Sequence, residues 1–325
     1  MTRTFMLSLA FVLGIAVSGA VPAGAASAAA GGAAPVIVPA AAAADGLQQR
    51  SINVGGDTRS YYLFAPAAKK GQALPLVIAF HGGGGGALQF AQRMKLVDMA
   101  SRHGMILVVP QGEGMGGGDD GGGSWNADST TPTGYAERNN VDDLGLVKAL
   151  IATVSAEYPV DKRRIYAVGF SKGGMMAYHA ACSLKGTFSA IAVVSATLSS
   201  ASCAYPKGVS VLHIHGTNDQ NVPFAGGAGE YTARRANWPA VSKGLAFFTS
   251  GNACPAKATK SQPASDTSCA TQNCGGDETV ELCMVQGGGH GWPGAPPAQW
   301  QIRRNVYVSQ NFNATEYIAA FLASH

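Results

Sequence analysis

Apolar residues occur along the chain in short continuous runs, and these alternate with longer stretches that have helical spacing. The continuous runs predict strands buried on both faces of a parallel sheet, and they lie at 76–80, 105–109, 165–168, 191–194, 209–214 and 280–285. A shorter strand is predicted at 61–64. Helical spacing predicts helices over 87–103, 142–158, 174–182 and 314–322. This alternation predicts an α/β fold with a mostly parallel sheet and helices on both faces.

The N-terminal segment differs in composition from the rest of the chain. Arg3 precedes an apolar run over 5–17, and the small residues that follow offer A-x-A cleavage after Ala25 or Ala28. The run is shorter than the about 20 residues that cross a bilayer, so we expect a signal peptide over 1–28 rather than an uncleaved anchor.

The next segment, 29–46, is rich in Ala, Gly and Pro, and we expect a flexible leader there. Residues 47–325 remain for one catalytic domain. We therefore expect a secreted or periplasmic protein with no membrane span after the signal is removed.

The net charge of the chain excludes few classes of function. The formal net charge is +4, only 13% of residues are charged, and loss of Arg3 with the signal lowers the charge to +3. This small surplus does not indicate nucleic acid binding, although it permits a local basic patch.

The six cysteines all lie in the second half of the chain. An even number in an exported protein indicates disulfide bonds. Our preferred pairing is Cys182–Cys203, Cys254–Cys283 and Cys269–Cys274. A metal site is the other interpretation, but the chain has no C-x-x-C pair. We expect neither a metal nor a cofactor.

The clearest chemical motif is G-x-S-x-G at residues 169–173, between a predicted strand and a predicted helix. A serine on such a sharp turn projects its hydroxyl out of the backbone. The N-terminus of the helix adds N–H groups and partial positive charge where an oxyanion would form. The pentapeptide alone is weak evidence in a chain with 43 glycines, but its position predicts that Ser171 is a nucleophile.

A serine nucleophile needs a base, and the base needs an acid that orients it. In α/β folds with this motif the order along the chain is Ser, then Asp or Glu, then His. His290 fits the base because it lies in a glycine-rich loop directly after the predicted strand at 280–285. The other histidines fit less well by their positions: His81, His103, His179, His213, His215 and His325.

Asp219 fits the acid because it lies in a turn-rich loop after the predicted strand at 209–214. Asp266 and Asp277 are its competitors, but both lie in the cysteine-rich segment, where we predict no strand. Asp219 would also suit an ordinary Asx-turn. The positions of Ser171 and His290 favour the catalytic interpretation.

Two backbone N–H groups are needed to hold a developing oxyanion. The amide of Lys172 directly follows the nucleophile and is one candidate. The glycine run after the predicted strand at 76–80 matches the HGGG-type element of esterases, so we expect the second amide at Gly82 or Gly83. Such a loop could instead cradle a phosphate, but the pattern G-x-x-x-x-G-K-[ST] is absent.

Nearly the whole folded region resembles the secreted poly(3-hydroxybutyrate) depolymerase and feruloyl esterase family of α/β-hydrolases. The matching stretches are 76–82, 124–126, 141–143, 160–161, 164–166, 169–177, Cys182, 215–217, Asp219 and 290–294. The resemblance implies an α/β-hydrolase fold, with Ser171, Asp219 and His290 as a triad that works through an acyl-enzyme. Asp142 and Asp143 also match, but we interpret them as the N-cap and first-turn acids of a helix.

Two features bear on the substrate, which we expect to be an extracellular polymer or oligomer. Family members that attack crystalline polyester usually carry an added polymer-binding domain, and this chain ends at residue 325, soon after His290. That favours soluble chains or oligomers. Lys172 places a cation in the first turn of a helix, where it opposes the helix dipole by about 0.3–1 kcal/mol. An anionic substrate would offset that cost; a solvated surface lysine is the other interpretation.

Other basic residues could extend an anionic site: Arg93, Lys95, Arg138, Arg234, Arg235, Arg303 and Arg304. Poly(aspartic acid) hydrolases are similar to this family and cleave a soluble polyanion, so poly(aspartic acid) is our first expectation for the substrate. Poly(3-hydroxybutyrate) oligomers and feruloyl or acetyl-xylan esters are the alternatives. Sugar esters would favour an aromatic cleft, which Trp125, Trp238, Trp292 and Trp300 could supply, although these tryptophans could equally belong to the core. Of the four, we take Trp125 and Trp292 as the substrate-binding candidates. A non-catalytic binding protein on the same scaffold is a more distant alternative.

Overall fold

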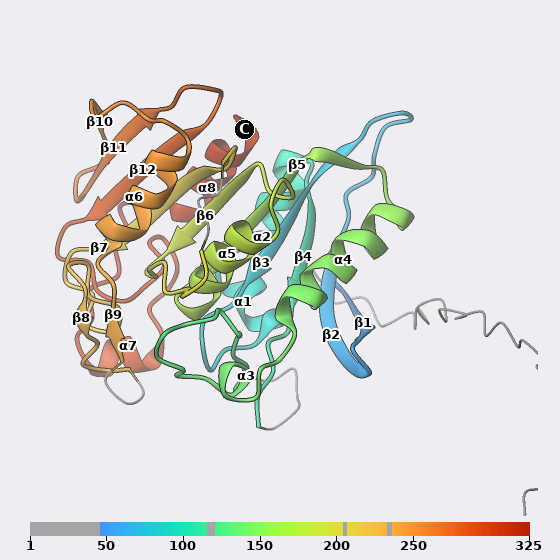
Figure 1. The fold of residues 1–325 in the computed structure, drawn as a ribbon, viewed down its shortest axis with the longest axis horizontal. Coiled ribbons are helices and arrows are strands. Elements are labelled where there is room, and N and C mark those ends of the chain that lie inside the picture. The colour runs from blue at the N-terminus through green and yellow to red at the C-terminus, as the bar shows by residue number, and fades with distance from the viewer. Residues whose placement is uncertain (1–45, 116–120, 204–206, 233–235) are drawn as a thin grey trace, which may run out of the picture. The chain divides into compact units, whose positions relative to one another are not determined.

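The computed structural model describes residues 46–325 except 116–120, 204–206 and 233–235 (Figure 1). The expected signal peptide, 1–28, and the expected leader up to residue 45 lie outside the described residues. In the part of the chain that is described, no helix has the length and apolar character needed to cross a membrane.

Ten strands of the described residues form one sheet in the order β1-β2-β4-β3-β5-β6-β7-β12-β11-β10. In that order their bounds are Gln48–Val54, Asp57–Phe64, Ile106–Pro110, Leu74–Phe80, Val160–Phe170, Ala190–Val194, Ser210–Gly216, Thr279–Val285, Thr267–Asn273 and Thr259–Ala264. Strands β4, β3, β5, β6, β7 and β12 pair in parallel, and the strands at both edges pair in antiparallel fashion. Strands β8 (Gly227–Ala228) and β9 (Asn237–Trp238) form a separate pair.

The central strands are buried on both faces, as their continuous apolar runs predict. In β3, Leu76, Ile78 and Phe80 belong to one hydrophobic core, while Val77 and Ala79 belong to the other. This alternation follows from the two-residue period of a strand. The sheet therefore separates two cores, and each core needs its own layer of helices.

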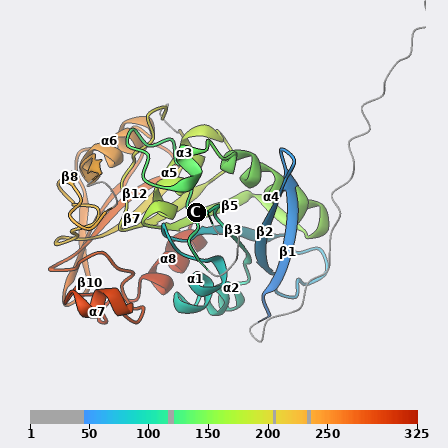
Figure 2. The same ribbon diagram turned by 90° about the horizontal axis from the view of Figure 1, so that it is seen from below.

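The helices supply those two layers (Figure 2). Helices α4, α5 and α6 contribute buried side chains to the core on one face, and α1, α2 and α8 contribute to the core on the other face. The helices span α1 Ala87–Arg93, α2 Leu96–His103, α3 Tyr135–Arg138, α4 Asp143–Glu157, α5 Lys172–Ser183, α6 Val241–Gly251, α7 Gln299–Arg303 and α8 Ala314–Ala323. The prediction of an α/β-hydrolase fold is confirmed.

Two predicted elements differ from the structure. The helix expected over 87–103 is two helices, because Lys95 takes a left-handed conformation with φ of 52° between them. The cysteine-rich segment, where no strand was expected, contains the antiparallel hairpin of β10 and β11. Most β10 side chains are exposed, so this strand has no apolar run that could predict it.

The disulfide pairing corrects two of the three expected bonds. Cys182–Cys203 is confirmed. The others are Cys254–Cys274 and Cys269–Cys283, so the expected bonds from Cys254 to Cys283 and from Cys269 to Cys274 are wrong. Cys269 and Cys283 are direct partners in the register of β11 and β12, which brings their Cα atoms to 4.0 Å. That pairing depends on a strand that the sequence pattern did not predict.

Candidate active site

Ser171 occupies a tight turn between β5 and α5. Its φ of 54° and ψ of −120° are a strained backbone conformation for a residue with a side chain. The glycines of the motif are required by packing: a Cβ at Gly169 would lie 2.1 Å from the carbonyl oxygen of Gly173, and one at Gly173 would lie 2.1 Å from that of Phe80. The turn places the serine at the carboxyl edge of the parallel strands, where sites in open α/β sheets occur.

The structure brings the three expected catalytic residues together. His290 follows β12 and Asp219 follows β7, and these two strands are parallel neighbours. Nδ1 of His290 lies 2.8 Å from Oδ2 of Asp219, and Nε2 lies 2.9 Å from Oγ of Ser171. The carboxylate accepts a hydrogen bond from the Nδ1–H group, so the unprotonated Nε2 can accept the proton of the serine hydroxyl.

Asp219 is buried and held in its ionised form. Its Oδ1 accepts hydrogen bonds from the backbone amides of Asn221 and Val222, both at 2.9 Å. Burial by itself raises the pKa of Asp219, but His290, His215 and the backbone donor outweigh that effect and hold the pKa below its ordinary value. The residue can therefore orient His290 and stabilise its protonated form.

A chain of buried side chains lies behind Asp219. His215 Nε2 is 2.8 Å from the carbonyl oxygen of Val222, His215 Nδ1 is 3.0 Å from His213 Nε2, and His213 Nδ1 is 2.7 Å from the hydroxyl of Tyr178. A carbonyl only accepts, so each group donates toward Val222: Tyr178 to His213, His213 to His215, and His215 to the carbonyl. Burial lowers the pKa of both histidines. Two neutral histidines therefore hold the loop that carries Asp219.

The glycine loop after β3 lies against the nucleophile turn. A Cβ at Gly82 would lie 3.5 Å from that of Ser171, and a Cβ at Gly83 would lie 3.4 Å from that of Lys172. The two segments from which oxyanion donors were expected are therefore adjacent.

His81 fixes the direction of this glycine loop. Its Nε2 accepts from the amide of Gly112 at 3.0 Å, so its Nδ1 carries the proton and donates to the carbonyl of Gly82 at 2.8 Å. The C=O and N–H of a trans peptide point in opposite directions, so a fixed Gly82 carbonyl also fixes the amide of Gly83. Burial lowers the pKa of His81 to about 4, which keeps the ring neutral near pH 7.

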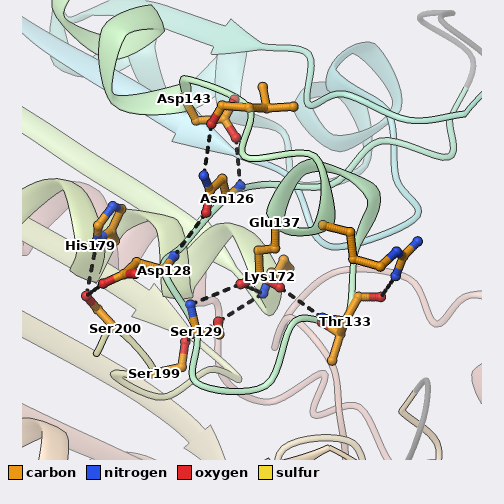
Figure 3. A network of polar contacts seen from close by, with 12 residues as sticks. Asn126, Asp128, Ser129, Thr133, Glu137, Asp143, Lys172, His179, Ser199 and Ser200 are labelled. Carbon is orange, nitrogen blue, oxygen red and sulfur yellow. Dashed lines mark hydrogen bonds and ion pairs between the residues drawn. The ribbon is translucent and has the colours of Figure 1, made fainter. Parts of the chain in front are cut away.

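The side chain of Lys172 is not a solvated surface group. It is only 6% exposed. Nζ forms an ion pair with Glu137 and lies 3.1 Å from Oγ of Ser129 (Figure 3). Glu137 belongs to α3, which was not predicted because four residues show no periodicity. Glu137 offsets the cost of a cation at the start of α5. The argument for an anionic substrate that rested on Lys172 therefore no longer holds.

A cavity of about 690 Å³ opens beside Ser171 and His290. Aromatic side chains form much of its wall: Tyr135, Phe170, Tyr231, Trp238 and Trp300. Such a cavity is large enough for a substrate of small-molecule size.

The two tryptophans expected in the substrate site lie in the core instead. Trp125 and Trp292 are 0% and 2% exposed. Their indole N–H groups donate internally, to the carbonyl of His81 at 2.8 Å and to Oγ1 of Thr315 at 3.0 Å. The sequence offered no way to distinguish these tryptophans from the two that line the cavity.

Asp142 and Asp143 have structural roles, as expected. Asp142 is the N-cap of α4 and accepts from the amide of Gly145 at 2.7 Å. Asp143 is buried, 2.8 Å from Arg59, and accepts from the amide of Asn126 at 2.7 Å. Burial raises the pKa of Asp143 to about 6 despite the opposing effect of Arg59.

Comparison with protein families gives one match over most of the chain. The family described as phospholipase/carboxylesterase matches residues 64–253. This range includes the nucleophile turn, the glycine loop and Asp219, while His290 follows it.

Comparison with individual proteins finds relatives that are named as esterases. NocK of Nocardia uniformis subsp. tsuyamanensis, whose name describes it as an esterase, is 30% identical over 75% of this chain and 74% of its own length. Feruloyl esterase B of Piromyces equi is 25% identical over 67% of this chain but 40% of its own length. Feruloyl esterase C of Emericella nidulans is 31% identical over 52% of this chain and 60% of its own length. The chain thus spans less than two thirds of both feruloyl esterases.

Solved structures with the same fold include an acetyl xylan esterase from Aspergillus awamori. It has a TM-score of 0.50 at 16% identity and covers 76% of this chain and 93% of its own. A thermostable esterase has a TM-score of 0.54 at 15% identity and covers 85% of this chain and 62% of its own. At these identities the likeness concerns the fold.

Proposed function

We propose that this chain, which belongs to the phospholipase/carboxylesterase family, uses Ser171 as the nucleophile of a secreted esterase. Like its relatives, the chain is a serine hydrolase of the esterase type. The observation that carries the proposed site is the position of His290, 2.9 Å from the Ser171 hydroxyl and 2.8 Å from the Asp219 carboxylate. Nucleophile, base and orienting acid need this arrangement.

The first step forms an acyl-enzyme. His290 Nε2 takes the proton of Ser171 as Oγ attacks the ester carbonyl, and a tetrahedral intermediate results. The imidazolium keeps its Nδ1 proton and is stabilised by the ionised Asp219. When the intermediate collapses, the C–O bond to the alcohol breaks and His290 gives the Nε2 proton to that alcohol.

The negative charge of the tetrahedral intermediate needs two donors. The amides of Lys172 and Gly83 are the proposed pair, because their residues lie side by side next to Ser171. Neither amide has to move during the reaction, since α5 holds one and the His81–Gly82 hydrogen bond directs the other. Loss of one such donor typically lowers kcat by about 10²–10³-fold.

The second step returns the enzyme to its starting state. His290 removes a proton from water as the water oxygen attacks the acyl carbonyl. The second tetrahedral intermediate then expels Ser171 Oγ, which recovers its proton from His290. The product is a carboxylic acid, and neither step as written requires a cofactor.

For the substrate we propose an ester that joins an aromatic acid or an acetyl group to a sugar. The aromatic side chains of the cavity support this choice, and so do the relatives named as feruloyl esterases. Poly(aspartic acid) and poly(3-hydroxybutyrate) oligomers are the competing substrates. Because Lys172 forms an ion pair with Glu137, its charge no longer supports poly(aspartic acid) as the substrate.

A side-by-side assay tests the proposed substrate. Purified protein is incubated with feruloylated arabinoxylan, acetylated xylan, poly(3-hydroxybutyrate) oligomers and poly(aspartic acid), with Ser171→Ala as the control. We expect release of ferulate or acetate that is absent from the control. Turnover of poly(aspartic acid) or of the polyester alone would contradict the sugar-ester proposal while leaving the hydrolase assignment intact.

Export of the protein is part of the proposal. Three disulfides in the described residues and no free cysteine support an oxidising compartment. The expected cleavage after Ala25 or Ala28 is tested by sequencing the N-terminus of protein recovered outside the cytoplasm. An N-terminus that still begins at Met1 would contradict a cleaved signal.

A further inference from the structure

Both oxygens of the Glu137 carboxylate have hydrogen-bond partners inside the protein. Besides its ion pair with Lys172, Oε1 accepts from the amide of Ser129 at 3.2 Å and Oε2 accepts from the amide of Thr133 at 2.9 Å (Figure 3). These contacts join α3 and the preceding loop to the start of α5. Helix α3 is therefore held at a fixed position beside the nucleophile, and the cation with which Glu137 forms its ion pair is Lys172.

Arg138, the next residue of α3, lines the catalytic cavity together with Ser171. Its side chain is exposed, and it donates to the carbonyl of Thr133 at 3.1 Å. No Asp or Glu is among the described residues that line this cavity, and the other lining cation, Lys172, is paired with Glu137. Within the described residues, Arg138 is thus a positive charge in the cavity wall without a carboxylate partner.

A second arginine, Arg304, contacts two aromatic side chains of the same cavity. The guanidinium of Arg304 is 4.4 Å from the ring centroid of Tyr231 and 6.0 Å from that of Trp300, and both rings line the cavity. A guanidinium stacked on aromatic rings keeps its N–H edges free for a partner.

The other basic residues that the sequence suggested supply no further cation to the described lining of this cavity. Arg93 and Lys95 border a separate cleft with Asp98 and Glu316. Arg234 and Arg235 lie outside the described residues, as do Asp119 and Asp120. Arg138 and Arg304 are therefore the residues on which an anion site at this cavity can be argued.

We propose that Arg138, assisted by Arg304, determines specificity by binding a carboxylate of the substrate close to the ester that Ser171 attacks. The inference rests on the proposed esterase function. Arginine suits the task because its planar fork can donate two parallel hydrogen bonds to a carboxylate. The aromatic side chains of the cavity would pack against the ring of an aromatic acid or a sugar. Together with the arginines, they indicate an ester of an acidic molecule as the substrate class, such as one that contains a uronic acid.

Two matched pairs of esters test the proposal, because the members of each pair differ by one negative charge and one methyl group. On the acyl side the pair is mono(4-nitrophenyl) adipate and its methyl ester. On the alcohol side the pair is 4-acetoxybenzoate and its methyl ester. The quantity measured is the ratio of kcat/KM for the charged ester to that for the neutral ester, in wild type and in Arg138→Ala.

We expect Arg138→Ala to lower this ratio about tenfold in at least one pair, which corresponds to about 1.4 kcal/mol. Arg138→Lys should lower it less, because the charge remains but the fork is lost. Arg304→Ala should lower the ratio in the same pair. The matched control is Arg163→Ala: this side chain is 92% exposed near the start of β5, at the opposite end of the strand from Ser171. The control should leave both ratios unchanged.

Salt supplies a second readout that a merely structural role would not change. Raising NaCl from about 0.05 to about 0.5 M should lower the wild-type ratio, because salt screens exposed charges, and should have little effect on Arg138→Ala. Equal ratios in wild type and Arg138→Ala for both pairs would overturn the proposal. If wild type cleaved none of the four esters, the proposed esterase function would fail instead.

Discussion

The ammonium group of Lys172 is buried against the carboxylate of Glu137, directly behind the amide proposed to hold the oxyanion. The pair joins the nucleophile helix α5 to α3, which forms part of the cavity wall. Both side chains are almost inaccessible to solvent, at 6% and 2% exposure. Their charges therefore depend on each other.

Removing one member of this pair should destabilise the protein strongly. Glu137→Gln leaves the Lys172 charge buried without its partner, and we expect the free energy of unfolding to fall by about 3–5 kcal/mol. Denaturant titration followed by fluorescence measures this. The double variant Glu137→Gln with Lys172→Met removes both charges and should recover part of the loss. A single variant as stable as wild type would show that the ion pair is not needed.

The same pair predicts a pH dependence of stability. Burial raises the pKa of Glu137, but Lys172 and the hydrogen bonds outweigh this and hold the pKa below its ordinary value of 4.5. In the range between the folded and unfolded pKa values the unfolded state binds more protons, so stability falls as pH falls. The Glu137 contribution should be complete above about pH 4.5 and lost below it.

Unfolding curves at a series of pH values between about 3 and 7 measure this effect. A Glu137→Gln protein should show a shallower loss of stability in acid than wild type does. Identical slopes in the two proteins would mean that Glu137 titrates in the same way folded and unfolded.

His81 should affect the rate of the chemical step through the glycine loop. His81→Phe removes one of the two donors to the Gly82 carbonyl, leaving the amide of Gly85, and leaves the Gly112 amide without its acceptor. We expect kcat on a neutral 4-nitrophenyl ester to fall about 10–100-fold with little change in KM, because oxyanion donors act mainly in the transition state. The ring is neutral above its pKa of about 4, so the variant should not alter the pH profile between about pH 6 and 9. An unchanged kcat would contradict a role of His81 in positioning the Gly83 amide.

The buried chain behind Asp219 should contribute to stability more than to rate. Tyr178→Phe deletes the hydroxyl that donates to His213 Nδ1 at 2.7 Å. A buried acceptor without a partner costs about 1–3 kcal/mol, and thermal or denaturant unfolding should show a loss of that size. Because His215 still donates to Val222, kcat/KM should stay within about twofold of wild type. A large loss of activity at unchanged stability would indicate a direct role in the reaction.

The sequence predicted those parts of the fold and site that depend on local pattern. Continuous apolar runs predicted the central strands, and the position of G-x-S-x-G predicted the turn at Ser171. The order of strands along the chain then placed Asp219 and His290 at the same edge of the sheet, where the structure has them within hydrogen-bond distance.

The parts that were missed depend on contacts between distant segments. The partner of Lys172 lies 35 positions away on a four-residue helix, so its charge was interpreted without Glu137. Strand β10 is mostly exposed and β11 is mostly polar, and without this hairpin the register that joins Cys269 to Cys283 could not be inferred. Which tryptophans line the cavity depends on packing that no local pattern records.

Labelling with a fluorophosphonate tests the central claim, that Ser171 is a nucleophile activated by His290, most directly. The probe reacts with an activated serine, and mass spectrometry of the digested protein locates the adduct. The account predicts one adduct on the peptide that contains Ser171, no adduct in Ser171→Ala, and strongly reduced labelling in His290→Ala. An adduct that persists in Ser171→Ala, or a folded wild-type protein that does not react, would contradict the account.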